Sequence, residues 1–332
     1  MGVSITNSGA IILDKVICDG HVPGSKIRVI THVHSDHLQG LEKSIRECDL
    51  ICSTPATKDL LEVMEGLYPL QMVTPLYGTP LNYEKNTITL YPSGHILGAA
   101  QVLVETENGE RYLYSSDFVY EKIQAINCDV LVLDATYGHP SCIRPPPSTI
   151  RRELINFVRE ELENNNSIII LGFYGKLQEV MSLLRKEKIE VPFINPPKVY
   201  LISKIYEKYG IHLGEFYSSN SELGRRITKS QQHIGFYHPS SRPKISENPV
   251  FIHLTGWQFG TPYKKVSSRE YIFSFSGHAD FNQLIKYVEE CKPKLVITDN
   301  ARPGEASRLA EEIKARLGIE AKPEPSSNNT KK

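Results

Sequence analysis

Short apolar runs rich in β-branched residues alternate with polar, glycine-containing segments in the first part of the chain. Runs of this length, bounded by turn residues, predict β-strands. From residue 11 to about residue 134, the predicted strands lie in AIILDKVICD, IRVITHV, DLICST, TITLYPSG, AQVLVETENGERYLYSSD and CDVLVLDATYG. Loops at the edge of a rigid sheet can bring side chains to one point, so the polar residues that follow these strands are candidates for a functional site.

The proline-rich segment Arg144-Pro-Pro-Pro-Ser148 marks a change of pattern. After it, the apolar spacing predicts amphipathic helices in STIRRELINFVREELENN, KLQEVMSLLRKEK and PKVYLISKIYEKYG, and a buried strand in SIIILGFYG. Beyond about residue 250 we expect strands in VFIHLTGW, EYIFSFSGH and KLVITD, and helices in FNQLIKYVEEC and ASRLAEEIKARLG. Strands that alternate with helices predict an α/β fold class.

Composition narrows the class of protein only a little. The 332 residues suffice for about two domains. The 38 Lys plus Arg balance the 38 Asp plus Glu, although residues 151–270 are basic, with 18 Lys plus Arg against 12 Asp plus Glu. This excess could follow a phosphate backbone or form a solvated helix face. No run approaches the roughly 18 apolar residues of a membrane helix, and MGVSITNSGA lacks signal-peptide features.

These features predict a cytoplasmic protein, nucleoid-associated in a prokaryote, with no membrane partner. The six cysteines are scattered without a Cys-x-x-Cys pair, so we expect reduced, buried thiols. Residues 321–332 lack apolar anchors and predict a disordered tail.

The segment THVHSDHLQG places four potential metal ligands after one predicted strand. His32 and His34 alternate with Val33, so both imidazoles point to the same side, and Asp36 and His37 follow within one turn. Imidazole and carboxylate groups suit zinc, and a division between two adjacent ions leaves positions open for water. Scattered surface histidines seldom give this spacing, so the segment predicts a metal-dependent hydrolase.

Two single residues further along the chain are candidates for the same site. His95 lies in YPSGHILGAAQ between two predicted strands, and Asp117 ends RYLYSSD. Alone, His95 would more often be a packing histidine and Asp117 a turn-forming residue. Their order and strand-end placement after the first cluster favour ligand roles.

The order of these residues resembles the motifs of the metallo-β-lactamase superfamily. Those motifs are an Asp at the end of an early strand, His-x-His-x-Asp-His, a single His and a bridging Asp. The residues that match them in order are Asp19, the cluster of His32, His34, Asp36 and His37, then His95 and Asp117. The resemblance implies two divalent metal ions, zinc or manganese.

By this resemblance, the first ion would be held by His32, His34 and His95 and the second by Asp36 and His37, with Asp117 as the bridge. Asp19 would orient the ligands. Many related chains have a further histidine at the position of Asp299 in KLVITDN. Asp299 is either a ligand of the second ion, since a carboxylate can bind zinc or manganese, or the cap of a strand.

Three other segments resemble the β-CASP branch of that superfamily, namely LDATYG, GKLQE and SFSGHADF. Its members are nucleases with an α/β cap inserted into the lactamase fold. The resemblance implies an αββα sandwich formed by residues 1–147 and 259–320, a β-CASP cap at 148–258 and the tail at 321–332. It also pairs Asp134 with His278, and a carboxylate bound to imidazole stabilises the protonated form that can donate a proton.

Contacts with substrate are predicted for Thr136, Lys176 and Trp257. Lys176 opens a helix, whose N-terminal N–H groups can bind phosphate. LTGWQFG, which contains Trp257, resembles Artemis-type DNA-repair nucleases and ligase-associated DNA exonucleases. A solvated Lys176 and a core-facing Trp257 are the alternatives.

We therefore expect a two-metal nuclease with Asp36, Asp134 and His278 as catalytic residues and nucleic acid as its partner. DNA is favoured over RNA, with 5′ to 3′ exonuclease activity in DNA repair or processing. One alternative is an RNA 3′-end processing endonuclease or a 5′ exoribonuclease of the same family. Another is a non-catalytic nucleic-acid-binding homologue with a decayed site at Asp299.

Overall fold

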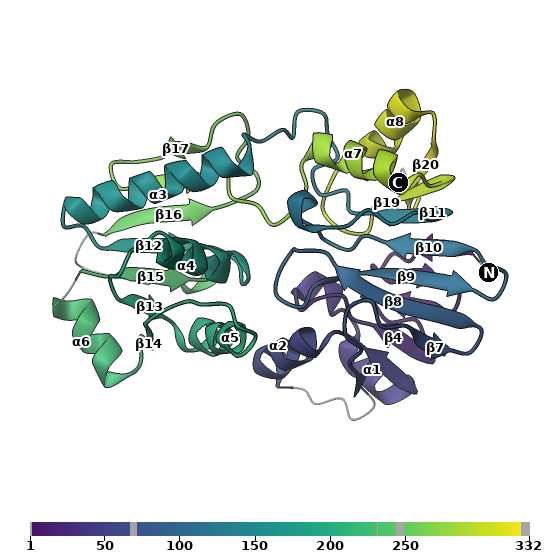
Figure 1. Ribbon diagram of the computed structural model, residues 1–332, viewed down its shortest axis with the longest axis horizontal. Helices are drawn as coiled ribbons and strands as arrows, with labels where there is room; N and C mark the ends of the chain where they lie inside the picture. The colour runs from purple at the N-terminus through teal and green to yellow at the C-terminus, as the bar shows by residue number, and fades with distance from the viewer. Residues whose placement is uncertain (1, 67–71, 231, 244–248, 327–332) are drawn as a thin grey trace, which may run out of the picture. The chain divides into compact units, whose positions relative to one another are not determined.

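The computed structural model describes residues 2–66, 72–230, 232–243 and 249–326, and the chain divides into two units (Figure 1). The interrupted unit consists of Met1–Cys142 and His278–Lys332, and the inserted unit consists of Ile143–Gly277. The described strands form two sheets in the interrupted unit and one in the inserted unit.

The first sheet of the interrupted unit follows the chain order. Its strands are β1 (Val3–Ile5), β2 (Ile11–Leu13), β3 (Val16–Cys18), β4 (Ile27–Val29), β5 (Leu50–Cys52) and β6 (Met72–Val73). The first three are antiparallel, and β3 to β6 are parallel. The parallel strands β3 and β4 therefore end at the same edge of the sheet.

The second sheet combines strands from both pieces of the interrupted unit. In spatial order they are β20 (Glu320–Glu324), β19 (Leu295–Asp299), β11 (Val130–Leu133), β10 (Arg111–Tyr114), β9 (Ala100–Thr106), β8 (Asn86–Pro92) and β7 (Leu81–Tyr83). The strands from β20 to β10 are parallel, and those from β10 to β7 are antiparallel. The carboxyl ends of β10, β11 and β19 therefore share one edge.

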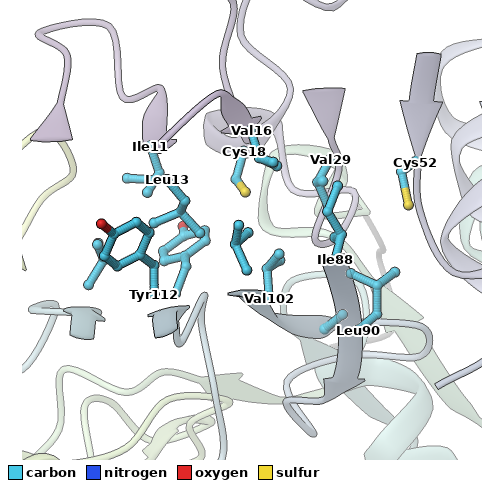
Figure 2. Close-up of a cluster of buried hydrophobic side chains, with 14 of the residues drawn as sticks. Ile11, Leu13, Val16, Cys18, Val29, Cys52, Ile88, Leu90, Val102 and Tyr112 are labelled. Atoms are coloured by element: carbon cyan, nitrogen blue, oxygen red, sulfur yellow. The ribbon is translucent and has the colours of Figure 1, made fainter. Parts of the chain in front are cut away.

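A common hydrophobic core joins the two sheets (Figure 2). Ile11 and Val29 from the first sheet and Leu90 and Val102 from the second are fully buried in it. Burial of these apolar side chains on both inner faces is the main force that holds the sheets together.

Helices cover the outer faces of the sandwich. The buried Arg28 of β4 donates to Ser44 of α1 (Leu41–Glu47), and α8 (Ala306–Leu317) lies beside β19 and β20 and packs on α7 (Phe281–Cys291) (Figure 1). The predicted α/β class and its αββα sandwich are confirmed.

Two helices lie in segments for which the apolar pattern predicted no element. They are α1 and α2 (Pro55–Glu65). Thr54 caps α2 by accepting a hydrogen bond from Thr57 N, Pro55 occupies the first turn, and Gly66 ends the helix with φ of 66°. Thr-Pro at the start and Gly at the end are standard helix boundaries, so this signal was present in the sequence.

The inserted unit is an α/β layer whose sheet has the order β14 (Phe216–Ser218), β13 (Phe193–Asn195), β15 (Ile234–Tyr237), β12 (Ile168–Leu171), β16 (Val250–Leu254), β18 (Glu270–Phe273) and β17 (Tyr263–Lys265). All pairs are parallel except β17 with β18. Its helices are α3 (Pro147–Glu163), α4 (Lys176–Lys186), α5 (Pro197–Lys208) and α6 (Glu222–Ser230).

The boundaries of the inserted unit differ from the predicted cap at residues 148–258. The structure places the return at His278, not at residue 259, because β18 pairs in parallel with β16 and so belongs to the inserted sheet. At the entry, Ile143 already belongs to the inserted unit.

The predicted tail from residue 321 is wrong over the residues that the structure describes. Residues 321–324 belong to β20, which pairs with β19 along its length, and Ala321 is buried. Pro323 and Pro325 suggested an irregular segment, but an edge strand tolerates proline. Residues 327–332 lie outside the described residues.

Within the described ranges, no helix combines the length and the apolar character needed to cross a membrane.

Candidate metal centre

The predicted ligands lie in loops that follow the strands of the sandwich. Asp19 follows β3, His32 and His34 follow β4, His95 lies between β8 and β9, Asp117 follows β10, Asp134 follows β11, and Asp299 ends β19. The cluster continues into η1 (Ser35–His37), a single 3-10 turn. Because neighbouring parallel strands end at the same edge, residues far apart in sequence converge there.

Four predicted ligands form one compact group. The ligand atoms of His32, His34, His95 and Asp117 all lie within 4.8 Å of one another. His34 Nδ1 is 3.2 Å from His32 Nε2 and 3.0 Å from His95 Nε2. Asp117 Oδ2 is 3.5 Å from His32 Nε2 and 3.5 Å from His95 Nε2.

These spacings are of the size found between neighbouring ligands of one metal ion. Zinc bonds of about 2.0–2.1 Å separate neighbouring ligand atoms by roughly 3.3 Å. Four of the six separations in the group are 3.0 to 3.5 Å, so these side chains could hold a single divalent ion at this first position. Three imidazoles and one carboxylate are the donor set that zinc commonly accepts.

The hydroxyl of Thr31 determines which nitrogen of His32 can bind metal. Thr31 Oγ1 donates its only proton to Asp19 Oδ2 at 2.6 Å. It can therefore only accept from His32 Nδ1, which lies 3.1 Å away. With the proton on Nδ1, His32 presents the lone pair of Nε2 to the metal position.

Asp19 also orients His37, as the resemblance implied. His37 Nδ1 donates to Asp19 Oδ2 at 2.7 Å. The opposite nitrogen, Nε2, is buried and has no hydrogen-bond partner among the described residues. It lies 3.4 Å from Asp36 Oδ2 and 3.5 Å from Asp117 Oδ1. This nitrogen thus faces two carboxylates, an arrangement that suits either a protonated imidazole or a metal ligand.

Burial and neighbouring charges shift the pKa values in this cluster. Burial lowers the pKa of His32 well below its usual value, with a further contribution from His37, so His32 stays neutral as a ligand must. Burial would raise the pKa of Asp117, but His37 and His278 outweigh it and hold this pKa well below normal. For Asp36, burial is outweighed by His37, and its pKa falls to about 2.

Asp134 and His278 form the predicted pair beside the metal position. His278 Nδ1 lies 3.0 Å from Asp134 Oδ2, and His278 Nε2 lies 3.7 Å from Asp117 Oδ2. Thr136 donates to Asp134 Oδ1 from its N–H at 2.8 Å and from its hydroxyl at 2.7 Å. Thr136, which we predicted to contact substrate, thus uses its hydroxyl proton to orient Asp134.

Asp299 faces an arginine that the sequence analysis did not single out. Asp299 Oδ1 accepts from Ala301 N at 2.9 Å, and Oδ2 accepts from Arg302 Nη1 at 2.6 Å. A second ion bound by Asp299 would therefore share this carboxylate with a fixed positive charge. The donor set thus fits the second position less well than the first, and the ligand role of Asp299 stays a prediction.

The other two predicted substrate contacts belong to the inserted unit. Lys176 is the first residue of α4, with Nζ 5.7 Å from the centre of the Phe173 ring. Trp257 has 57% of its surface exposed, so the alternative of a core-facing side chain does not hold.

Sequence reasoning missed three residues that shape the site, namely Thr31, Ser116 and Arg302. Ser116 donates to Thr31 Oγ1 at 2.8 Å and has φ of 52°. Asp19 also has a positive φ, 54°, and non-glycine residues in this strained region concentrate at functional sites. Backbone strain cannot be read from a single sequence. The three-residue spacing of Asp299 and Arg302, by contrast, could have suggested the ion pair that they form.

Comparisons with known proteins agree with this geometry. The family model of the Zn-dependent metallo-hydrolase RNA specificity domain matches residues 264–322. A probable DNA ligase of Opitutus terrae is 25% identical over 316 residues, which are 91% of this chain and 29% of that protein. Transcription termination factor FttA of Methanosarcina mazei is 26% identical over 391 residues, 89% of this chain and 61% of the relative. This chain thus spans less than two thirds of either relative.

A solved structure shares the fold. It is a protein of unknown function from Enterococcus faecalis, with a TM-score of 0.59 and 14% identity, covering 82% of this chain and 74% of the other. The family-model match and the strand-end site together place the chain in the class of the metallo-hydrolases. Within that class, it belongs to the β-CASP branch of the metallo-β-lactamase superfamily.

The role of Asp19 gives a prediction on metal affinity. Asp19→Ala should weaken zinc binding about 10- to 100-fold, because groups that orient metal ligands typically contribute that much. Competition with a chromogenic chelator measures the affinity, and circular dichroism checks the fold. Asp49→Ala, at a side chain that is 69% exposed, is the matched control. Unchanged zinc affinity in Asp19→Ala would contradict the role assigned to this carboxylate.

Proposed function

We propose that this chain is a metal-dependent nuclease that cleaves DNA from the 5′ end in DNA repair or processing. The observation that carries the proposal is the Asp134–His278 pair, whose outer nitrogen faces Asp117 of the metal centre. A phosphodiester needs both electrophilic assistance and a proton for its departing oxygen. This site has groups suited to both tasks.

The metal position and the carboxylates would act on the attacking side. His32, His34, His95 and Asp117 would hold a divalent ion, which would supply Lewis acidity when bound. Asp36 and Asp117 stay ionised, because His37 holds down the pKa of both carboxyls. We assign to these two carboxylates the orientation of the attacking water, from which they would accept hydrogen bonds.

His278 would act on the leaving side. Asp134 accepts from Nδ1 and favours the protonated imidazole, so Nε2 can donate a proton to the departing oxygen. Thr136 holds Asp134 in place with two hydrogen bonds. An imidazole fixed in this way needs little reorganisation when charge develops on the leaving group.

The preference for DNA is supported by the likeness to a probable DNA ligase over 91% of this chain. The matched RNA specificity domain and the likeness to a transcription termination factor support the second candidate, an RNA-processing nuclease of the same family. Recognition of RNA would require contacts with 2′-hydroxyl groups.

A matched panel of strands tests the proposal. The protein with zinc or manganese is given DNA and RNA of one sequence, labelled at either end. We expect 5′-labelled DNA to release a short labelled product at once, and 3′-labelled DNA to shorten progressively. Faster cleavage of RNA would favour the second candidate. Binding without cleavage by the metal-loaded protein would favour a non-catalytic homologue.

The Asp134–His278 pair gives a separate prediction. Asp134→Asn and His278→Ala should each lower kcat about 10²- to 10⁴-fold, the usual contribution of a positioned proton donor. Metal content, measured by mass spectrometry of the native protein, should stay unchanged. His212→Ala, at an exposed histidine, serves as the control. A loss of metal in parallel with activity would instead make His278 a ligand.

A further inference from the structure

Arg302 is a buried cation next to the second metal position. Its side chain is 10% exposed. Nη1 donates to Asp299 Oδ2 at 2.6 Å, and Nη2 donates to the carbonyl oxygens of Gly9 at 3.2 Å and Asp36 at 3.3 Å. Nε lies 3.8 Å from Asp36 Oδ2. The guanidinium is thus fixed by main-chain oxygens as well as by a carboxylate.

A guanidinium keeps its positive charge at any pH that the fold survives. Here it is held against Asp36, which the resemblance assigned to a second ion, and against Asp299, for which a ligand role and a strand-cap role were both open. A divalent ion bound by these groups would meet a like charge that cannot move away without losing its hydrogen bonds. The first position has no such conflict, because its ligand group consists of three imidazoles and Asp117 and contains no arginine.

We propose that Arg302 takes the electrostatic place of the second divalent ion, so that the chain binds one metal ion tightly. Asp299 then serves as the partner that positions Arg302, and Asp36 lies between the arginine and His37. Arg302 is a positioning residue that neutralises Asp36. This inference holds whether or not the substrate is a nucleic acid.

Metal stoichiometry tests the proposal directly. Metal-free full-length protein is titrated with zinc or manganese and followed by calorimetry and native mass spectrometry. We expect one tight ion in the unaltered protein and in Arg302→Lys, which keeps the charge. Arg302→Met with Asp299→His should bind a second ion at least roughly tenfold more tightly than the unaltered protein, the scale typical of groups around a metal site. Arg308→Met, at an exposed arginine of α8, is the control.

Two outcomes would overturn the proposal. One is a second ion bound by the unaltered protein as tightly as the first. The other is a double variant that folds, as judged by its thermal unfolding, and still binds only one ion. Since the readout is metal content, it stands apart from any failure of the nuclease assays.

A separate observation in the inserted unit concerns the edge of its sheet. The neighbouring strands β12 and β15 are parallel. From β12 the chain proceeds to β13, beyond β15 in the sheet order, whereas from β15 it proceeds to β16, beyond β12. Open α/β sheets bind ligands at the carboxyl ends of strands where the connections diverge in this way.

Aromatic rings gather at this point. Phe173 and Tyr174 follow β12, and His238 follows β15. The rings of Tyr174 and His238 are stacked with centres 4.9 Å apart, and Phe173 meets His238 edge-on at 5.0 Å. Phe173 is 51% exposed, which is unusual for so apolar a side chain.

Two lysines accompany these rings. Lys176 Nζ lies 5.7 Å from the Phe173 ring centre, and Lys198 Nζ lies 5.8 Å from that of Tyr174. Lys176 opens α4 and Lys198 stands in the first turn of α5. Cations beside exposed aromatic faces suit a ligand with planar rings and negative charges.

We infer that Phe173, Tyr174 and His238 form a stacking platform for bases of a single-stranded nucleic acid, with Lys176 and Lys198 holding its phosphates. The inference rests on the proposed nuclease function and names how the strand is held. Stacking of this kind tolerates any base sequence, because every base has a planar face.

Strand binding and small-substrate hydrolysis test the platform. Anisotropy of a labelled oligonucleotide is measured without metal, and hydrolysis of bis(p-nitrophenyl) phosphate with metal. Phe173→Ala should weaken strand binding roughly 5- to 150-fold, the range for loss of one stacked base, and leave small-substrate hydrolysis unchanged. Leu201→Ala, at an exposed residue of α5, is the control.

The two possible failures are distinguishable. If the unaltered protein binds and cleaves strands but Phe173→Ala and Lys198→Ala bind them equally well, the platform is wrong and the nuclease proposal stands. If the unaltered protein neither binds nor cleaves any strand, the nuclease proposal fails first and the platform with it.

Discussion

The buried carboxylate of Asp19 is the constraint on which the metal centre depends. It accepts hydrogen bonds from Thr31 N, Thr31 Oγ1 and His37 Nδ1, all within the protein interior. The first two bonds fix the loop after β4, and the third fixes the ring of His37. Because the Thr31 hydroxyl donates its proton to Asp19, it can only accept from His32, which therefore carries its proton on Nδ1. The Asp19 carboxylate thus sets the tautomer of His32 and the ring orientation of His37.

Two residues of the interrupted unit, one on each side of the insertion along the chain, also lie at this site. The chain approaches it after β11, where Asp134 lies, and re-enters the interrupted unit at His278. These two residues form a hydrogen-bonded pair next to Asp117, and both belong to the interrupted unit.

Much of the site was predictable because it obeys local rules. His32, His34, Asp117 and Asp134 stand directly after apolar strands, and strand ends are visible in a hydrophobic pattern. The short strands β13 and β14, with three residues each, and the helix α1 gave too little pattern to find. The return at His278 was misplaced because pairing of β18 with β16 is a long-range property. Arg302 was missed because its meaning lies in contacts with Gly9 and Asp36, far away in sequence.

A crystal grown with zinc and measured at the zinc absorption edge would show whether these side chains hold an ion. We expect one strong anomalous peak at about 2.0–2.2 Å from His32 Nε2, His34 Nδ1, His95 Nε2 and a carboxylate oxygen of Asp117, the bond lengths usual for zinc. Absence of a peak among these four groups in zinc-saturated protein would contradict it.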